Sequence, residues 1–313
     1  MNNAPNLTVV IPVYKEAQHI KLVIEEIDKQ LILLQTSYEL IIVDDGSPDN
    51  TWSVINELAS KYPMLKGLRL SRNFGKEYAL CAGLEAAKGE AVIVMDGDLQ
   101  HPPYLIPQMV SIWRESKTEI VEAIKVYRGK ESIINQWAAS TFYSILNRMS
   151  GYNLKNASDY KLLDRKVVNV WLKMGERNLF FRGMTAWLGF HHVQIPFEVG
   201  QRIGGKSKWS FFSLVKLAIT GITAFSSFPL HFVTFSGYLF LTFSILLGLQ
   251  ALFLKFAGKA VDGFTTVILI ILILGSLLMI SLGIIGIYIA RIYEEVKNRP
   301  RYIIAEILEN SNK

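Results

Sequence analysis

With 313 residues, the chain is long enough for two domains, or for one large domain with an appendage. Its only cysteine, Cys81, excludes an intramolecular disulfide and a cluster of thiolate metal ligands. The formal net charge of +6 is too small to indicate a nucleic-acid partner, although it suits a surface that lies against anionic lipid or handles phosphates.

Strand-like and helix-like segments alternate through the first 124 residues. Apolar runs rich in β-branched residues predict strands, and apolar residues at helical spacing predict helices. In chain order these are a strand at 7–13, a helix at 17–34, a strand at 38–43, a helix at 48–62, a strand at 65–70, a helix at 76–87, a strand at 91–95, a helix at 102–113 and a strand at 119–124. This alternation indicates an α/β fold with a mostly parallel sheet covered on both faces.

Polar segments follow three of the predicted strands, at the sheet edge where parallel sheets bind ligands. They are YKE at 14–16, DDGS at 44–47 and DGD at 96–98. Asp96 and Asp98 are two positions apart, so in an extended chain both carboxylates point to the same face. Neighbouring anions repel unless a cation lies between them, which favours a hard divalent metal ion. An ordinary turn is the alternative, because Asp and Gly both favour turns.

Charged residues become scarce after about residue 211. Residues 209–230 are aromatic-rich and are expected to lie flat in a bilayer interface. Two uncharged stretches, at about 232–254 and 264–290, are each long enough to cross a hydrocarbon core, and they predict a transmembrane hairpin over residues 231–291. Basic residues in and near the tail, residues 292–313, favour a cytoplasmic C-terminus. An even number of spans then places the N-terminal domain, residues 1–208, on the same side.

Five segments occur in an order and at spacings that resemble one family. They are VIPVYKE at 10–16, VDDGSPDNT at 43–51, LSRNFGKEYAL at 70–80, MDGDLQHPP at 95–103 and RIGGKSKW at 202–209. The chain resembles the family 2 glycosyltransferases, whose fold is the Rossmann-like GT-A fold. Within them it resembles the polyprenyl-phosphate glycosyltransferases, which include the bactoprenol glucosyltransferases and the dolichol-phosphate mannose synthases. The resemblance covers nearly the whole chain.

The resemblance implies a donor site for a nucleoside-diphosphate sugar. Asp45 would hydrogen-bond the base, Asp96 and Asp98 would hold Mg²⁺ or Mn²⁺, and Lys76 could reach a phosphate or simply be solvated. The other implied donor residues are Pro12, Tyr14 and Glu16 beside the nucleoside, and Arg202 and Lys208 over the diphosphate. A solvated basic loop ahead of a membrane helix is the alternative for the last two. Asp98 and Arg202 are also expected to take part in catalysis.

For the acceptor, the resemblance points to Asp159 as the general base. The segment departs from the family's more usual Gly-Asp-Phe-Arg by having Ser158, Tyr160 and Lys161. A phosphate monoester is largely dianionic at neutral pH and hardly needs deprotonation, so Asp159 could instead orient the acceptor or stabilise charge on the sugar. A helix N-cap is the structural alternative. Lys125, Arg128 and Ser132 are expected to bind the acceptor phosphate, or to form an exposed basic turn.

The expected function is therefore inverting transfer of a hexose from a UDP-sugar to polyprenyl phosphate, at the cytoplasmic face of the inner membrane. The resemblance makes glucose the default sugar, with N-acetylglucosamine, mannose or a modified sugar as alternatives. It also implies a homo-oligomer, a tetramer. A processive polysaccharide synthase would need a longer channel and a Gln-x-x-Arg-Trp motif, which the sequence lacks. A catalytically inactive membrane adaptor or flippase component is the rival from another class.

Overall fold

The computed structural model describes residues 5–126, 158–177, 179–198, 228–258 and 263–309. The chain forms two compact units. The first comprises Met1–Leu214 with Arg299–Lys313, and the second comprises Val215–Asn298. The predicted boundary at residue 208 and nearly all of the predicted interfacial region lie outside the described residues. The segment after residue 298, predicted as part of a tail, belongs with the N-terminal unit.

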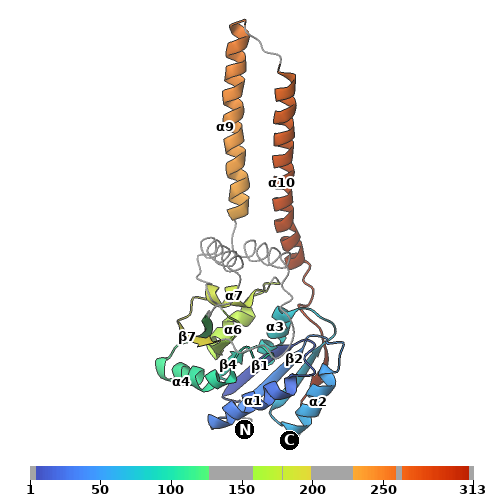
Figure 1. Cartoon of the computed structure of the whole chain (residues 1–313), viewed down its shortest axis with the longest axis vertical. Helices are drawn as coiled ribbons and strands as arrows, with labels where there is room; N and C mark the ends of the chain where they lie inside the picture. The colour runs from blue at the N-terminus through green and yellow to red at the C-terminus, as the bar shows by residue number, and fades with distance from the viewer. Residues whose placement is uncertain (1–4, 127–157, 178, 199–227, 259–262, 310–313) are drawn as a thin grey trace. The chain divides into compact units, whose positions relative to one another are not determined.

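In the described part of the first unit, an eight-stranded mixed sheet has the order β7-β5-β6-β4-β1-β2-β3-β8 (Figure 1). Strands β4, β1, β2 and β3 are mutually parallel, and β5 is parallel to β7. Strand β6 is antiparallel to β4 and β5, and β8 is antiparallel to β3. The bounds are β1 Leu7–Val13, β2 Tyr38–Asp44, β3 Leu65–Leu70, β4 Ala91–Val94, β5 Ile120–Val126, β6 Lys161–Asp164, β7 His192–Glu198 and β8 Ile304–Leu308.

Helices cover both faces of the sheet, as predicted (Figure 1). On one face, α1 (Ile20–Leu33), α2 (Thr51–Lys61) and α4 (Ile106–Ser116) contribute to the main apolar core, and a 3₁₀ turn, η1 (Pro103–Leu105), precedes α4. On the other face lies α3 (Lys76–Ala86), in contact with α6 (Arg165–Lys173). Helix α3 approaches the sheet so closely that a Cβ on Gly83 would lie 2.2 Å from Val10 Cγ1. Helix α7 (Phe181–Trp187) packs Phe181 edge-on against Trp171 of α6.

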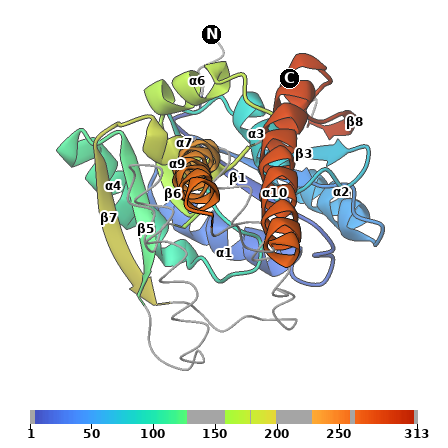
Figure 2. The same ribbon diagram turned by 90° about the horizontal axis from the view of Figure 1, so that it is seen from above.

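The β3 edge of the sheet is covered by β8, which comes from the end of the chain (Figure 2). Just before β8, Ser71 N donates to Ile303 O at 2.9 Å. Glu306 of β8 accepts hydrogen bonds from Arg69 Nη1 at 2.7 Å and from Trp52 Nε1 at 3.0 Å. Strand β8 belongs to the first unit, yet it follows both apolar helices of the second unit in the sequence.

The second unit contains two long apolar helices, α9 (Phe228–Phe256) and α10 (Phe264–Val296). Within them, Pro229–Phe256 and Ile270–Val296 are long and apolar enough to cross a membrane. At about 1.5 Å per residue, each stretch is longer than the roughly 30 Å of a hydrocarbon core. The most apolar part of each helix is not buried inside the protein, so these helices are not core helices of a globular domain. The predicted pair of apolar helices is thus present.

Candidate active site

A cavity of about 400 Å³ opens at the carboxyl ends of β1, β2 and β4. The cavity is lined by every described residue that was predicted to bind the sugar-nucleotide donor or the metal ion. The lining residues are Pro12, Val13, Tyr14, Glu16, Asp45, Asn73, Gly75, Lys76, Ala79, Asp96, Gly97 and Asp98. Parallel strands end at a common edge, so segments far apart in the sequence meet here.

Asp45 is fixed at one end of the cavity by the turn before α3. Its Oδ1 accepts from Phe74 N at 2.7 Å and its Oδ2 from Gly75 N at 2.9 Å. Burial raises the pKa of this carboxyl above its ordinary value, against these two hydrogen bonds. Gly75 has a φ of +109°, a conformation that side-chain-bearing residues rarely adopt, so the turn depends on glycine. Each carboxylate oxygen of Asp45 keeps a second lone pair for a ligand.

Asp96 and Asp98 follow β4, and both face the cavity. The backbone N–H of Asp96 donates to His101 Nδ1 at 3.0 Å, which assigns the ring proton of a neutral His101 to Nε2. His101 is itself buried and stacked on Tyr160, with ring centroids 5.1 Å apart. Asp98 Oδ1 accepts from Gln100 N at 3.0 Å. A turn is therefore present after β4, and both aspartates line the cavity, while their convergence on one metal ion stays a prediction.

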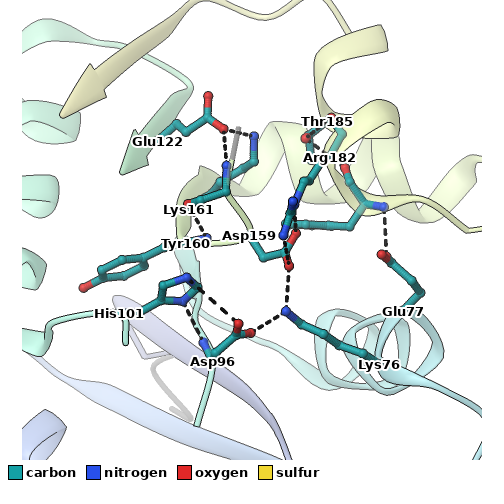
Figure 3. A network of polar contacts seen from close by, with 12 residues as sticks. Lys76, Glu77, Asp96, His101, Glu122, Asp159, Tyr160, Lys161, Arg182 and Thr185 are labelled. Carbon is teal, nitrogen blue, oxygen red and sulfur yellow. Dashed lines mark hydrogen bonds and ion pairs between the residues drawn. The ribbon is translucent and has the colours of Figure 1, made fainter. Parts of the chain in front are cut away.

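Asp96 also belongs to a cluster of two carboxylates and two cations, formed with Lys76, Asp159 and Arg182 (Figure 3). Lys76 Nζ is 2.5 Å from Asp96 Oδ1 and 2.6 Å from Asp159 Oδ2. Arg182 binds Asp159 with two nitrogens, Nε at 2.7 Å to Oδ1 and Nη2 at 2.9 Å to Oδ2. The side chain of Asp159 is only 5% exposed. Asp159 is therefore a buried carboxylate held between an ammonium and a guanidinium.

These contacts set the ionisation of the cluster. Burial alone would raise the pKa of Asp159, but attraction to Lys76 and then Arg182 outweighs it and holds that pKa far below the ordinary value. Burial likewise works against the charge on Lys76, and Asp96 and Asp159 together raise its pKa all the same. The pKa of Asp96 is lowered, again because Lys76 outweighs burial. All three groups are charged at neutral pH.

A buried network holds Asp159 in place, and it is built from the residues that depart from the family pattern. Ser158 Oγ donates to Ala123 O at 2.5 Å, and Ser158 N donates to Glu122 Oε1 at 3.2 Å. Lys161 Nζ lies 2.7 Å from the same Glu122 oxygen. Tyr160 OH donates to Pro102 O at 3.1 Å. Position 158 is thus tied to β5 and position 160 to the segment before α4.

Glu77, next to Lys76 on α3, closes the cluster on its far side. Its Oε2 accepts from Phe181 N at 2.9 Å, which fixes the start of α7 and so the position of Arg182. Burial, and then the charge of Asp159, raise the pKa of Glu77 to about 7. Glu77 is therefore the group of this cluster whose charge changes near neutral pH.

The carboxylates fit a divalent metal ion of the Mg²⁺ type. Asp96 Oδ1 is buried and accepts no hydrogen bond of good geometry, although the Lys76 ammonium lies close to it. No group of three His, Cys, Asp or Glu side chains that could hold a metal occurs among the described residues. Mg²⁺ is typically bound by one or two carboxylates with substrate phosphates and water completing its shell, and Asp96 and Asp98 match that donor set.

Several predicted residues cannot be placed in this site. Arg128, Ser132, Arg202 and Lys208 lie outside the described residues. Lys125 pairs with Phe197 in the sheet through its backbone, and its side chain also lies outside what the structure describes. The roles assigned to these five residues, and to the residues that line the cavity, stay predictions.

Sequence reasoning missed His101, Glu122 and Arg182. Arg182 meets Asp159 from 23 positions further along the chain, and no spacing rule connects them. Glu122 lies in the middle of an apolar strand, and a buried charge there was the one available signal, because such a residue needs a partner. His101 was part of a motif that we used only for its two aspartates.

Comparison with known proteins shows the family to which the chain belongs. The family model described as "Glycosyl transferase family 2" matches residues 8–171. An uncharacterized glycosyltransferase of Synechocystis is 38% identical over 306 residues, with 96% of this chain and 95% of the relative covered. A bactoprenol glucosyl transferase of Shigella phage SfII is 37% identical over 301 residues, with 95% and 97% covered.

Among solved structures, glucosyl-3-phosphoglycerate synthase from Mycobacterium tuberculosis in complex with Mn²⁺, UDP-glucose and phosphoglyceric acid is 20% identical. Its TM-score is 0.47, and the match covers 70% of this chain and 78% of that one. The full-length relatives and the family model, together with the sheet topology, confirm the predicted GT-A fold and the resemblance on which it was based. The chain is a glycosyltransferase and belongs to glycosyl transferase family 2.

Proposed function

We propose that the protein transfers a hexose, glucose, from UDP-glucose to polyprenyl phosphate with inversion at the anomeric carbon. The observation that carries the proposal is the cavity at the strand ends, where the two carboxylates after β4 meet the cluster around Asp159. The bactoprenol glucosyl transferases that match along nearly the whole chain support the sugar and the lipid acceptor. The two apolar helices support a reaction at a membrane.

The donor end of the reaction follows from the cavity. Asp45 offers carboxylate lone pairs to the imide N–H of uracil, with Pro12, Tyr14 and Glu16 beside the nucleoside. A divalent ion held by Asp96 and Asp98 supplies Lewis-acid neutralisation of the diphosphate when it is bound. Lys76, in the same cavity, adds a further positive charge for the leaving UDP.

At the acceptor end, a phosphate oxygen of the lipid forms a bond to the anomeric carbon as the bond from that carbon to the UDP oxygen breaks. The acceptor is largely dianionic at neutral pH, so this step needs no proton acceptor. Asp159, paired with Arg182 and Lys76 and with a strongly lowered pKa, is poorly suited to be a base. We therefore propose a positioning role: Asp159 holds Arg182 and Lys76 in place and so helps to orient the acceptor phosphate.

The chain's connectivity supports one orientation in the membrane. The segments before α9 and after α10 belong to the same folded unit, as β8 shows, and one folded unit cannot lie on both sides of a bilayer. The two helices must then cross and return. The basic residues Arg291, Lys297, Arg299 and Arg301 favour the cytoplasm for that unit and for both termini. In a Cys81→Ala background, Ala257→Cys should be labelled by an impermeant maleimide from outside the cell, and Lys29→Cys should not.

The test of the reaction uses the purified full-length protein, labelled UDP-glucose, Mg²⁺ and undecaprenyl phosphate. Label should move to the lipid, and Asp96→Asn should slow transfer by about 100-fold or more, since charge stabilisation at a leaving group contributes several kcal/mol. Glu57→Gln, on the exposed surface of α2, is the matched control and should leave the rate unchanged. UDP-glucose binding without transfer to lipid would instead favour the inactive adaptor. The tetramer stays a prediction for a mass measurement in detergent.

A further inference from the structure

The Lys76 ammonium lies against one of the two carboxylate oxygens with which Asp96 would hold a metal ion. Lys76 Nζ lies 2.5 Å from Asp96 Oδ1, one of the carboxylate oxygens available to coordinate a metal. Mg²⁺ binds carboxylate oxygens at about 2.0–2.1 Å, so an ammonium and a divalent ion on this one oxygen would lie only about 4 Å apart. Like charges at that distance repel strongly. The two cations therefore compete for Asp96.

Asp159 can release Lys76 without becoming an unpaired buried charge. Arg182 holds both of its carboxylate oxygens, at 2.7 and 2.9 Å, independently of Lys76. Arg182 is itself positioned through α7, whose first N–H is bound by Glu77. A bidentate guanidinium is a rigid partner, whereas an ammonium on a four-carbon stem moves easily. The cluster thus combines one fixed cation with one that can be exchanged.

The displaced Lys76 ammonium can also reach a second anionic partner in the cavity. It is the first residue of α3, it lines the same cavity as Asp45 and Asp98, and its side chain is 39% exposed. Phosphate groups bind favourably near a helix N-terminus and to lysine. An ammonium displaced from Asp96 by a metal ion can therefore move to a diphosphate in the cavity with little backbone movement.

We propose that Lys76 is an exchangeable internal cation. It neutralises Asp96 and Asp159, yields Asp96 to a divalent metal ion, and then binds the diphosphate that enters with it. The inference rests on the proposed nucleotide site, but its first part concerns the metal alone. Because Lys76 competes for Asp96, the metal ion binds weakly when no nucleotide is present, and the metal ion and the nucleotide bind cooperatively.

The test measures Mn²⁺ binding to the full-length protein without nucleotide, from the electron paramagnetic resonance signal of free Mn²⁺. Lys76→Gln should bind Mn²⁺ about tenfold more tightly than wild type or better, because one nearby charge shifts a cation equilibrium by 10-fold to 1000-fold. With saturating Mn²⁺, the same variant should bind UDP more weakly. Lys76→Arg keeps the charge and should resemble wild type in Mn²⁺ binding, and Lys61→Gln on the surface of α2 is the control for loss of a lysine.

Unchanged or weaker Mn²⁺ binding by Lys76→Gln, with a thermal unfolding midpoint close to that of wild type, overturns the proposal. If the variant is unstable, Lys76→Met replaces it, since an apolar stem of similar length fills the same space. Loss of Mn²⁺ binding in Asp96→Asn shows that the measured ion is the one in question. Tighter Mn²⁺ binding by Lys76→Gln combined with failure to glucosylate lipid would leave the exchange standing and refute the proposed function instead.

Discussion

Replacing Lys161 with methionine should strongly destabilise the catalytic unit. Lys161 and Glu122 form a buried ion pair at 2.7 Å, with side chains 5% and 6% exposed. Methionine fills similar space but leaves Glu122 charged and buried, and among the described residues its remaining donors are Ser158 N at 3.2 Å and Gln194 Nε2 at 3.3 Å. Breaking one partner out of a buried pair typically costs about 3–5 kcal/mol. For a unit of this size that corresponds to a fall of about 6–20 °C in the unfolding midpoint.

The assay is thermal unfolding of the detergent-solubilised full chain, followed by tryptophan fluorescence. The double variant Lys161→Met with Glu122→Gln removes both charges, and it should recover much of the loss, because replacing a whole buried pair is often close to neutral. A single variant that unfolds within 2 °C of wild type would refute the reasoning. So would a double variant less stable than the single one, since the cost would then not come from an unpaired charge.

Three further predictions concern packing, pH and the sheet edge. Gly83→Ala should cost about 1–3 kcal/mol, seen as a lower unfolding midpoint, because its Cβ would lie 2.2 Å from Val10 Cγ1. The pKa of Glu77 is about 7 in the folded state against an ordinary 4.5, so between these values the folded state binds a proton that the unfolded state has lost. The free energy of unfolding of wild type should therefore fall by up to about 3 kcal/mol relative to that of Glu77→Gln as pH rises from 4.5 to 8. An equal difference between the two unfolding midpoints at both pH values would contradict this. Glu306→Ala leaves Trp52 Nε1 without its acceptor and should speed proteolytic release of the C-terminal segment, whereas Glu306→Gln should not.

The parallel half of the sheet was predictable because its strands are short, continuous apolar runs between helices of ordinary length. Predicted and observed helix ends differ by up to four residues. The helix expected at 102–113, for example, is a 3₁₀ turn followed by α4, which begins at Ile106 and runs on to Ser116, just before Lys117 with its φ of +52°. Strands β6 and β8 were not predicted as strands. β8 (Ile304–Leu308) has a charged residue at its centre and two half-buried ends, so its pattern is that of an exposed tail.

The site could be predicted where one motif contains the chemistry, and not where the partners come from separate motifs. Asp96 and Asp98 belong to one motif that follows a strand, and both line the cavity at the strand ends. The position of Asp159 beside Lys76 depends on a sheet in which β6 pairs with β4, and no local pattern encodes that pairing. The role of Asp159 stays a prediction, and its charged partners could not be foreseen for the same reason. Its low pKa comes from Lys76 and Arg182, which lie 83 and 23 residues away.

Strand β8 has a consequence for how the protein is made. The ribosome finishes β3 early and reaches β8 only after α9 and α10, so the nascent domain carries an open strand edge while both apolar helices are being synthesised. Open edges promote pairing between chains. A premature stop codon between the start of α10 and the start of β8 would leave every cavity residue encoded but the sheet without its last strand. Completion of the catalytic unit is thereby tied to completion of its two apolar helices.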